Sequence, residues 1–365
     1  MTKPTLAYIG LGSNLGDRQS CIRNAVAMLA DIPGVEVQRS SDIIETAPLA
    51  GFEQPKYLNR VAEIKTNLTA QALYQKMAQI ENSLGRVRQG KWSSRTIDLD
   101  LLLFGNEIIN TAELTIPHPQ MHLRSFVLKG LCQLNPEFEH PLIKVSAAEL
   151  ARRLNGCDFV LKAELPQLIS IAGVIGVGKT TLTKKLAARL GGKQLFEPYD
   201  TNPFLPQVYA GEKELALDSQ LYFLASRLGQ LTPAALTPGA PVISDYIFDQ
   251  EIIYAKRLLN PEQLILHEQI YLPLSKMVAL PVLVIYLKDT ARNCLTRIVK
   301  RNRPYEQKID LKFLDAFESD YENFFNNWKT CPVIRIELCE FDCTKPADVD
   351  NLSNQIKSYI SAKNV

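Results

Sequence analysis

The first part of the chain mixes two spacings of apolar residues, one typical of strands and the other of helices. Runs that predict strands cover 5–9, 57–66 and 96–104, and spacings that predict helices cover 18–30, 69–84 and 145–154. Thr69 is expected to cap the second helix, and Asn155-Gly156 to end the third. This mixed order predicts an α+β sheet that carries helices on one face.

The later part of the chain alternates buried strands with helices. The predicted strands cover 168–172, 241–245, 281–287 and 333–338. This repetition predicts a parallel sheet between helices, which is a three-layer α/β domain. We therefore predict an α/β protein with domains at 1–157 and 167–365, joined by a linker at 158–166.

Composition agrees with two globular domains and narrows the classes of function. The 365 residues are 46% hydrophobic and 22% charged, and the formal net charge of +2 does not indicate a nucleic-acid binder. The seven cysteines form no C-x-x-C pair and are expected to be reduced. The start of the sequence has no apolar h-region and no small-residue cleavage site, so we expect no signal peptide. No run approaches the roughly 18 apolar residues that a membrane span needs. We expect a cytoplasmic protein with small anionic ligands and no nucleic-acid or membrane partner.

The most informative motif is the glycine-rich segment 173–180, which lies between a predicted strand and a predicted helix. Glycines let successive backbone N–H groups surround a phosphate, and the helix that follows adds its positive end. Lys179 would reach the outer phosphates, and Thr180 would offer its hydroxyl to Mg²⁺. The ATP-binding residues predicted here are Gly173, Gly176, Gly178, Lys179, Thr180 and Thr181.

A second glycine-rich segment, 10–16, follows the first predicted strand. It reads G-x-G-x-x-x-G and is one residue longer than the dinucleotide-binding fingerprint, with Glu36 as the only acidic candidate farther on. A tight turn is the favoured interpretation, and cofactor binding is the alternative.

Two carboxylates, Asp98 and Asp100, share one face of the strand predicted at 96–104. Like charges this close, among apolar residues, need a cation between them. Mg²⁺ that bridges to substrate phosphates satisfies this need. The alternative is a strand end that turns toward solvent.

A basic segment, 86–95, directly precedes the two carboxylates and contains Trp92. Arginines suit phosphate oxygens, and an indole can cover a flat ring. A solvated basic loop is one alternative, and a groove for single-stranded nucleic acid is another, although such a groove needs more stacking rings. Together with the carboxylates, this segment predicts metal-assisted phosphoryl chemistry.

Residues 8–16, 85–88, 92–100 and 116–119 resemble 6-hydroxymethyl-7,8-dihydropterin pyrophosphokinase. The resemblance covers roughly residues 5–155. It implies a ferredoxin-like fold and transfer of the β,γ-pyrophosphoryl group of ATP to the pterin hydroxymethyl oxygen, which leaves AMP.

The same resemblance implies roles for individual residues. Asp98 and Asp100 would hold Mg²⁺, and ATP would be contacted by Arg86, Arg88, Trp92, Arg95, His118 and Arg124. The pterin pocket would be lined by Thr46, Pro48, Leu49, Tyr57, Asn59 and Phe126. Glu81 would orient substrate, unless it is an exposed helix residue. Zinc binding by His118 and His122 is disfavoured because Pro119 interrupts any helix and no third ligand is evident.

Two segments after the phosphate loop carry further candidates. Glu197, in Phe196-Glu197-Pro198, could accept the proton of a substrate hydroxyl, although a surface position is the alternative. The segment 294–307 places Arg297, Arg301 and Arg303 within seven positions. Such a segment could close over the nucleotide and neutralise the transferring group, and a basic helix end is the alternative.

This part resembles the deoxynucleoside kinase family over about residues 167–325, through 196–198, 202–205, 220–227 and 297–307. The resemblance implies that Glu197 is the general base on the sugar 5′-hydroxyl and that Arg227 lies beside it. It also implies that Asp245 serves Mg²⁺, that Gln220 pairs with the base edge, and that Tyr209 and Glu306 hold the 3′-hydroxyl. The lid arginines would be Arg297, Arg301 and Arg303.

One departure from the family pattern concerns Ser244-Asp245-Tyr246-Ile247, where many members carry an acidic-Arg-Ser triplet. Tyr246 cannot supply a guanidinium. Arg227 or the lid would then supply it, or catalysis is slower or altered.

We interpret the chain as a bifunctional kinase with ATP as co-substrate and Mg²⁺ as cofactor at both sites. Its expected partners are a pterin, a deoxynucleoside and ATP, with a homodimer formed through the C-terminal domain. The alternative is that only the pyrophosphokinase is active and that the C-terminal domain is regulatory or dimerising.

Overall fold

The computed structural model describes residues 4–49, 53–86 and 93–361. The chain divides into two compact units, Met1–Val160 and Leu161–Val365. Within the described ranges, no helix is long and apolar enough to cross a membrane.

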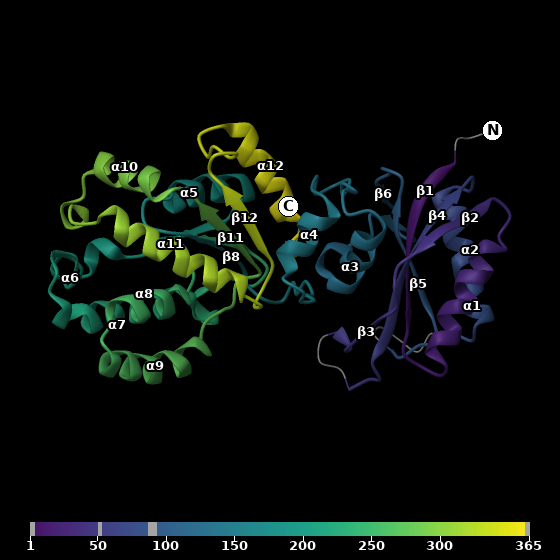
Figure 1. Cartoon of the computed structure of the whole chain (residues 1–365), viewed down its shortest axis with the longest axis horizontal. Helices are drawn as coiled ribbons and strands as arrows, with labels where there is room; N and C mark the ends of the chain where they lie inside the picture. Colours follow the sequence, from purple (N-terminus) through teal and green to yellow (C-terminus); the bar gives the residue numbers. More distant parts are fainter. Residues whose placement is uncertain (1–3, 50–52, 87–92, 362–365) are drawn as a thin grey trace. The chain divides into compact units, whose positions relative to one another are not determined.

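The N-terminal unit is built on an antiparallel sheet with the strand order β2-β4-β1-β5, and β3 pairs with β4 (Figure 1). Its elements are β1 (Thr5–Ser13), α1 (Arg18–Ala30), β2 (Val35–Ser40), β3 (Ile44–Thr46), β4 (Tyr57–Thr66), α2 (Ala70–Ser83), β5 (Asp98–Phe104), β6 (Ile109–Asn110), β7 (Thr115–Ile116), α3 (Ser125–Leu134) and α4 (Ala147–Leu154).

The expectation that helices cover one face of this sheet is wrong. Ile9 of β1 packs with α1 and α2, whereas the adjacent Tyr8 packs with α3 and α4. The reason is visible in β5: its successive residues from Leu101 to Phe104 are all buried, so both faces of the strand are covered.

Local signals placed the helix ends of this unit correctly. The Thr69 hydroxyl accepts a hydrogen bond from the Ala72 N–H at 3.2 Å and begins α2. Asn155 ends α4 in the left-handed conformation, with a φ of 47°. The turn predicted at 10–16 is shorter than expected, because β1 continues to Ser13 and only the second half of the segment turns.

The C-terminal unit is built on a parallel sheet with the strand order β12-β11-β8-β10-β9. Its elements are β8 (Gln167–Ala172), α5 (Lys179–Leu190), β9 (Lys193–Leu195), α6 (Leu205–Ala210), α7 (Ala216–Leu231), β10 (Pro241–Ser244), α8 (Gln250–Leu258), α9 (Pro261–Ser275), β11 (Leu283–Lys288), α10 (Ala291–Arg301), α11 (Leu311–Asn326), β12 (Val333–Glu337) and α12 (Pro346–Lys357).

Helices cover both faces of this parallel sheet, as its continuous apolar strands require. Leu168 of β8 packs in one core with Leu224 of α7, and Tyr286 of β11 stacks on Phe325 of α11. Helix α5 contacts β8, β9 and β10, and α12 packs against α5. The phosphate loop follows β8, Glu197 follows β9 and Asp245 follows β10, so these segments meet at the carboxyl edge of the sheet.

Candidate functional site

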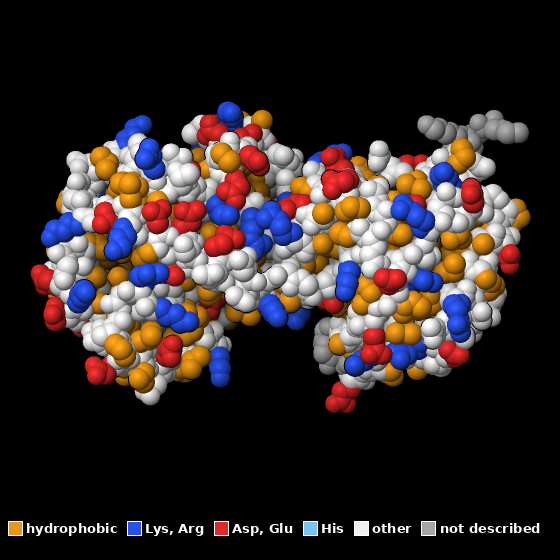
Figure 2. All heavy atoms as spheres, in the orientation of Figure 1, with side chains coloured by type: hydrophobic (Ala, Val, Ile, Leu, Met, Phe, Trp, Pro, Cys, Tyr) orange, Lys and Arg blue, Asp and Glu red, His pale blue; other side chains and the backbone are white. Residues whose placement is uncertain are grey.

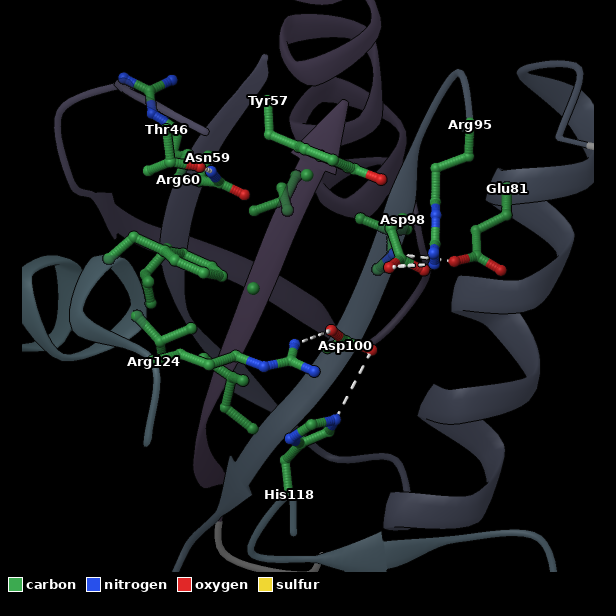
Figure 3. A pocket seen from close by; sticks show the side chains of 18 of the residues that line it. Thr46, Tyr57, Asn59, Arg60, Glu81, Arg95, Asp98, Asp100, His118 and Arg124 are labelled. Carbon is green, nitrogen blue, oxygen red and sulfur yellow. Dashed lines mark hydrogen bonds and ion pairs between the residues drawn. The ribbon is translucent and has the colours of Figure 1, made fainter. Parts of the chain in front are cut away.

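The N-terminal unit encloses a cavity of about 640 Å³ between its sheet, α2 and the start of α3 (Figure 3). Most of the predicted residues line it: Thr46, Leu49, Tyr57, Asn59, Glu81, Arg86, Arg95, Asp98, Asp100, His118, Arg124 and Phe126. Pro48 is not among the lining residues, although Ala47 and Leu49 on either side of it are. Arg88 and Trp92 lie outside the described residues.

The two aspartates of β5 both face this cavity, so the solvent-facing alternative is wrong (Figure 3). Asp98 lies between two arginines, with 2.5 Å from its Oδ1 to Arg86 Nη1 and 2.6 Å from its Oδ2 to Arg95 Nη1. Asp100 lies 3.6 Å from Arg124 Nη1. Burial raises the pKa of Asp98, and the neighbouring charge of Asp100 adds to this effect. The carboxylates are therefore held by cations.

The residues of the cavity fit Mg²⁺ together with a polyphosphate. Among the described residues, no group of three His, Cys, Asp or Glu side chains could hold a metal ion on its own. Mg²⁺ commonly needs only one or two carboxylates when phosphates complete its shell. The Nε of Arg124 is buried and makes no hydrogen bond, so a donor remains for an anionic oxygen.

Glu81 is buried in this cavity, so its interpretation as an exposed helix residue is wrong. Its Oε1 accepts a 2.7 Å hydrogen bond from the N–H of Leu99 and also pairs with Arg86. Burial raises the pKa of Glu81. Its carboxylate thus joins α2 to β5 and places Arg86 against Asp98.

The opposite end of the cavity has the polar groups expected for a pterin. Asn59 Nδ2 donates to Thr46 Oγ1 at 2.8 Å, across the β3–β4 pair. Gly12 of β1 lies opposite Asn59, and a Cβ there would be 3.2 Å from Asn59 Oδ1.

The two histidines that were considered as zinc ligands have other surroundings. His118 lies near Asp100 and is neutral at neutral pH, because burial lowers its pKa to about 4. His122 packs edge-on against His140, with ring centroids 6.1 Å apart.

Two residues that sequence reasoning missed hold this site together. Asp158 Oδ1 accepts hydrogen bonds from the Ser125 N–H at 2.6 Å and the Ser125 hydroxyl at 2.8 Å, which fixes the start of α3 beside Arg124 and Phe126. Asn14 Oδ1 accepts from the Arg95 N–H at 2.7 Å. Both contacts join segments far apart in sequence, and no local pattern indicates them.

The glycines of the phosphate loop in the C-terminal unit are required by their conformation and surroundings. Gly173 and Gly176 have φ values of 138° and 85°. A Cβ would lie 2.5 Å from the Leu287 carbonyl oxygen at the first position and 2.6 Å from the Cys294 carbonyl oxygen at the second. Gly178, with a φ of 107°, leads directly into α5.

Lys179 and Thr180, the predicted phosphate and metal contacts, both lie at the phosphate loop. Lys179 Nζ donates to the carbonyl oxygens of Gly173 at 2.7 Å and Val174 at 3.1 Å, so the ammonium lies over the loop. Burial lowers the pKa of Lys179. The Thr180 hydroxyl donates to Asp245 Oδ2 at 2.6 Å, which brings the two predicted Mg²⁺ residues together. Thr181 is exposed on α5.

Glu197 lies at this centre, so the surface alternative is wrong. Its N–H donates to Asp245 Oδ1 at 2.8 Å, and its Oε1 accepts from Arg227 Nε at 2.8 Å. Gln220, from the same helix as Arg227, is 2% exposed, and its Oε1 is buried without a hydrogen bond. A buried amide oxygen of this kind fits a donor on a base edge.

Tyr246, which stands where many family members have an arginine, is part of the core of the C-terminal unit. The Tyr246 ring is fully buried in the apolar core beside α7, and its hydroxyl donates to Gln230 Oε1 at 3.0 Å. Both the ring and the hydroxyl of Tyr246 are thus engaged in the core against α7. The guanidinium beside the predicted base belongs to Arg227.

The three arginines that are predicted to form a lid lie in α10 and just after it. Arg297 approaches the Gly176 carbonyl oxygen at 3.5 Å and pairs with Asp289. Arg301 binds Glu306 through two nitrogens, at 2.6 and 2.5 Å. The Arg303 guanidinium lies 4.0 Å from the ring centroid of Tyr199. Tyr209 contacts Phe313 edge-on, and burial raises its pKa. The basic segment thus reaches both the phosphate loop and the 3′-hydroxyl candidates.

Comparisons with known proteins divide the chain in the same way. The family model described as 7,8-dihydro-6-hydroxymethylpterin-pyrophosphokinase matches residues 8–136, and the model described as deoxynucleoside kinase matches 169–361. The 2-amino-4-hydroxy-6-hydroxymethyldihydropteridine pyrophosphokinase of Bacillus subtilis is 46% identical over 37% of this chain and 80% of its own length. The deoxyguanosine kinase of the same species is 38% identical over 42% of this chain and 76% of its own length.

Solved structures of deoxyadenosine kinase from M. mycoides are also similar to this chain. The structure with bound dATP has a TM-score of 0.46 and 24% identity, and the match covers 52% of this chain and 99% of that one.

The chain belongs to two families of kinases: residues 8–136 to the pterin pyrophosphokinases and residues 169–361 to the deoxynucleoside kinases. It is an enzyme of the transferase class with a folate-biosynthesis domain and a deoxynucleoside kinase domain.

Proposed function

We propose that this chain catalyses two ATP-dependent reactions. One transfers pyrophosphate to 6-hydroxymethyl-7,8-dihydropterin, and the other phosphorylates the 5′-hydroxyl of a deoxynucleoside. The observation that supports this most directly is that each unit gathers its own acidic and basic groups around one site. In one, Asp98 lies between Arg86 and Arg95, and in the other, Thr180, Asp245 and Glu197 are joined beside the phosphate loop.

In the N-terminal reaction, the pterin hydroxymethyl oxygen attacks the β-phosphorus of ATP. The new O–P bond forms as the bond between the β-phosphorus and the α,β-bridging oxygen breaks, AMP leaves with that oxygen, and the hydroxyl proton is released to water. Arg86, Arg95 and Arg124 would neutralise charge on the phosphate oxygens. Mg²⁺, when held by Asp98 and Asp100, would supply Lewis-acid stabilisation of the same oxygens.

In the C-terminal reaction, the sugar 5′-oxygen attacks the γ-phosphorus while Glu197 takes the hydroxyl proton. The bond between the γ-phosphorus and the β,γ-bridging oxygen breaks, and ADP leaves. Lys179 and Arg297 would stabilise charge on the transferring group. Thr180 and Asp245 are the residues that would hold Mg²⁺.

The alternative, with an inactive C-terminal domain, rests on Tyr246. The position of Arg227 beside Glu197 favours an active site instead, because a guanidinium is present without the family triplet. A nucleic-acid function is not favoured, since acidic and basic side chains are interspersed on the face shown in Figure 2.

Purified protein with ATP, Mg²⁺ and each acceptor tests the two proposed activities together. We expect AMP with the pterin and ADP with a deoxynucleoside. Deoxyguanosine is the first nucleoside to test, because the Bacillus subtilis relative is a deoxyguanosine kinase. AMP without any nucleoside-dependent ADP would favour the alternative of an inactive C-terminal domain.

We further propose that the protein is a cytoplasmic homodimer formed through α9. Exposed apolar side chains lie along α9 and just after it: Ile265, Leu266, Leu272, Met277 and Leu280 (Figure 2). A two-fold interface pairs such a patch with its own copy.

Analytical ultracentrifugation tests this interface. We expect a dimer for the unchanged chain and a monomer for the Ile265→Glu, Leu272→Glu double variant, because a buried unpaired carboxylate is unfavourable. A variant with Glu268→Gln, on the same helix, serves as the control. Equal masses for all three proteins would contradict the assignment.

A further inference from the structure

A row of buried charged side chains extends behind Glu197 from α7 through α8 to α9. Arg227, Glu251 and His267 are 2%, 0% and 1% exposed, respectively. Arg227 Nη1 binds Glu251 Oε2, and His267 Nε2 lies 3.0 Å from Glu251 Oε1. Because an ionised carboxylate only accepts hydrogen bonds, His267 Nε2 is the donor. Both oxygens of Glu251 are therefore occupied.

The side chains that contact the Glu197 carboxylate all bind the same one of its two oxygens, Oε1. Arg227 donates to Oε1 through Nε at 2.8 Å and also through Nη2. Gln250 Nε2 donates to the same Oε1 at 2.8 Å. None of the residues that the structure describes donates to Oε2. Oε1 is thus the anchored oxygen, and Oε2 is the one left to accept a substrate proton.

The Arg227 guanidinium is held in a fixed plane. It is clamped between the carboxylates of Glu197 and Glu251, and its Cζ lies 5.2 Å from the ring centroid of Phe223. Without a correctly oriented Glu251, one side of this clamp is lost. The orientation of Glu251 therefore affects that of Glu197.

Helix α9 fixes Glu251 by contacts at the start of α8. The buried residues of α9 are His267 and Tyr271. His267 contacts Glu251, and the Tyr271 hydroxyl donates to Asp249. Helices α7, α8 and α9 all pack against one another, and Figure 1 shows the three close together.

We propose that His267 is a positioning residue for nucleoside phosphorylation. Through Glu251 it orients Arg227, so that Arg227 holds Oε1 of Glu197 and leaves Oε2 for the 5′-hydroxyl proton. The inference rests on the proposed deoxynucleoside kinase activity. It also explains how the chain operates with Tyr246 in place of an arginine: Arg227 supplies the guanidinium at the base, and His267 and Glu251 keep it there.

Steady-state kinetics of His267→Leu and His267→Gln test this role. Leucine removes the donor, and we expect kcat for nucleoside phosphorylation to fall about 10- to 100-fold with the KM values for ATP and nucleoside changed less than about threefold. The side-chain amide introduced by His267→Gln can donate to Glu251 and should restore kcat to within about threefold of the unchanged enzyme. Glu268→Gln, an exposed neighbour, is the matched control.

AMP formation from ATP and pterin by the same preparations is the internal standard, and it should be equal in all variants. Should His267→Leu fail to fold, His267→Asn replaces it, since the shorter amide does not reach Glu251. Equal kcat for the leucine and unchanged enzymes would overturn the inference. The inference would also be overturned if His267→Gln had a normal melting temperature but the same low kcat as His267→Leu. A change in His267→Leu that is confined to the KM for the nucleoside would overturn it as well. Absence of nucleoside phosphorylation by the unchanged chain would overturn the proposed function itself.

Discussion

Replacing Lys179 by alanine is expected to lower kcat/KM for nucleoside phosphorylation by about 10³-fold or more, or about 4 kcal/mol. The ammonium lies over the phosphate loop, where it contacts the Gly173 and Val174 carbonyl oxygens, and no other described lysine is placed there. AMP formation from pterin and ATP should be unchanged, because that site is built from residues of the other unit. Both products can be measured in one chromatographic assay.

Lys193→Ala, at an exposed lysine of β9, is the matched control and should keep both activities. If the Lys179 variant is folded and loses both, the two sites are not independent. If it keeps nucleoside phosphorylation, the phosphate loop is not the site of that reaction.

Replacing Asp98 by alanine should have the opposite selectivity. We expect AMP formation to fall by about 10³-fold or more, because one of the two carboxylates for Mg²⁺ is lost and the cations around it lose their counter-charge. Arg86 and Arg95 both contact Asp98, so Arg95 would lose its carboxylate partner and Arg86 would keep only Glu81. Nucleoside phosphorylation should be unchanged, and rates of AMP and ADP formation measure both effects.

Asp98→Asn separates charge from shape, since it keeps the side-chain volume and removes the negative charge. The rate of AMP formation by this variant should be nearly as low as that of Asp98→Ala. Glu107→Ala, at an exposed carboxylate just after β5, is the control and should retain full activity. An undiminished pyrophosphokinase rate in the Asp98 variants would remove the metal assignment.

The elements that sequence predicted well are those whose signals are local. The helix predicted at 18–30 and the strand predicted at 57–66 have the same bounds in the structure. Thr69 begins α2 through a hydrogen bond and Asn155 ends α4 through its φ angle, and both signals depend on a few neighbouring residues. The parallel sheet followed from repeated strand–helix units, and the comparisons confirm the fold class.

Helices on one face of the N-terminal sheet were predicted wrongly because spacing along a strand does not show which helix covers it. The four buried residues from Leu101 to Phe104 carried the signal for a strand buried on both faces. That signal identifies neither α3 nor α4 as the second layer. The helices of the second layer begin only at Ser125, well after β5 ends at Phe104, so their packing on the sheet depends on how the intervening chain folds.

Some residues of the candidate sites could be placed from local sequence, and others could not. Asp98 and Asp100 are two residues apart, and the glycines, Lys179 and Thr180 lie in one loop, so local geometry was sufficient to place them together. Glu81 and Glu197 could not be distinguished from surface carboxylates, because their burial comes from partners on other elements: Leu99 and Arg86 for the first, Arg227 and Gln250 for the second.

By itself, the sequence was sufficient to predict two phosphate-handling centres in this chain, since alternation along a strand and glycine conformation act over a few residues. The tertiary structure alone decided which cations meet each carboxylate and that Asp158 binds the first residue of α3. It also decided between Arg227 and the lid, the two candidates named from the sequence, because the guanidinium beside Glu197 is that of Arg227. The physical reason is that burial, hydrogen bonding and ion pairing depend on distances in space and not on separation along the chain. The partners can be far apart in sequence: 81 positions separate Asn14 from Arg95, and 121 separate Gly176 from Arg297.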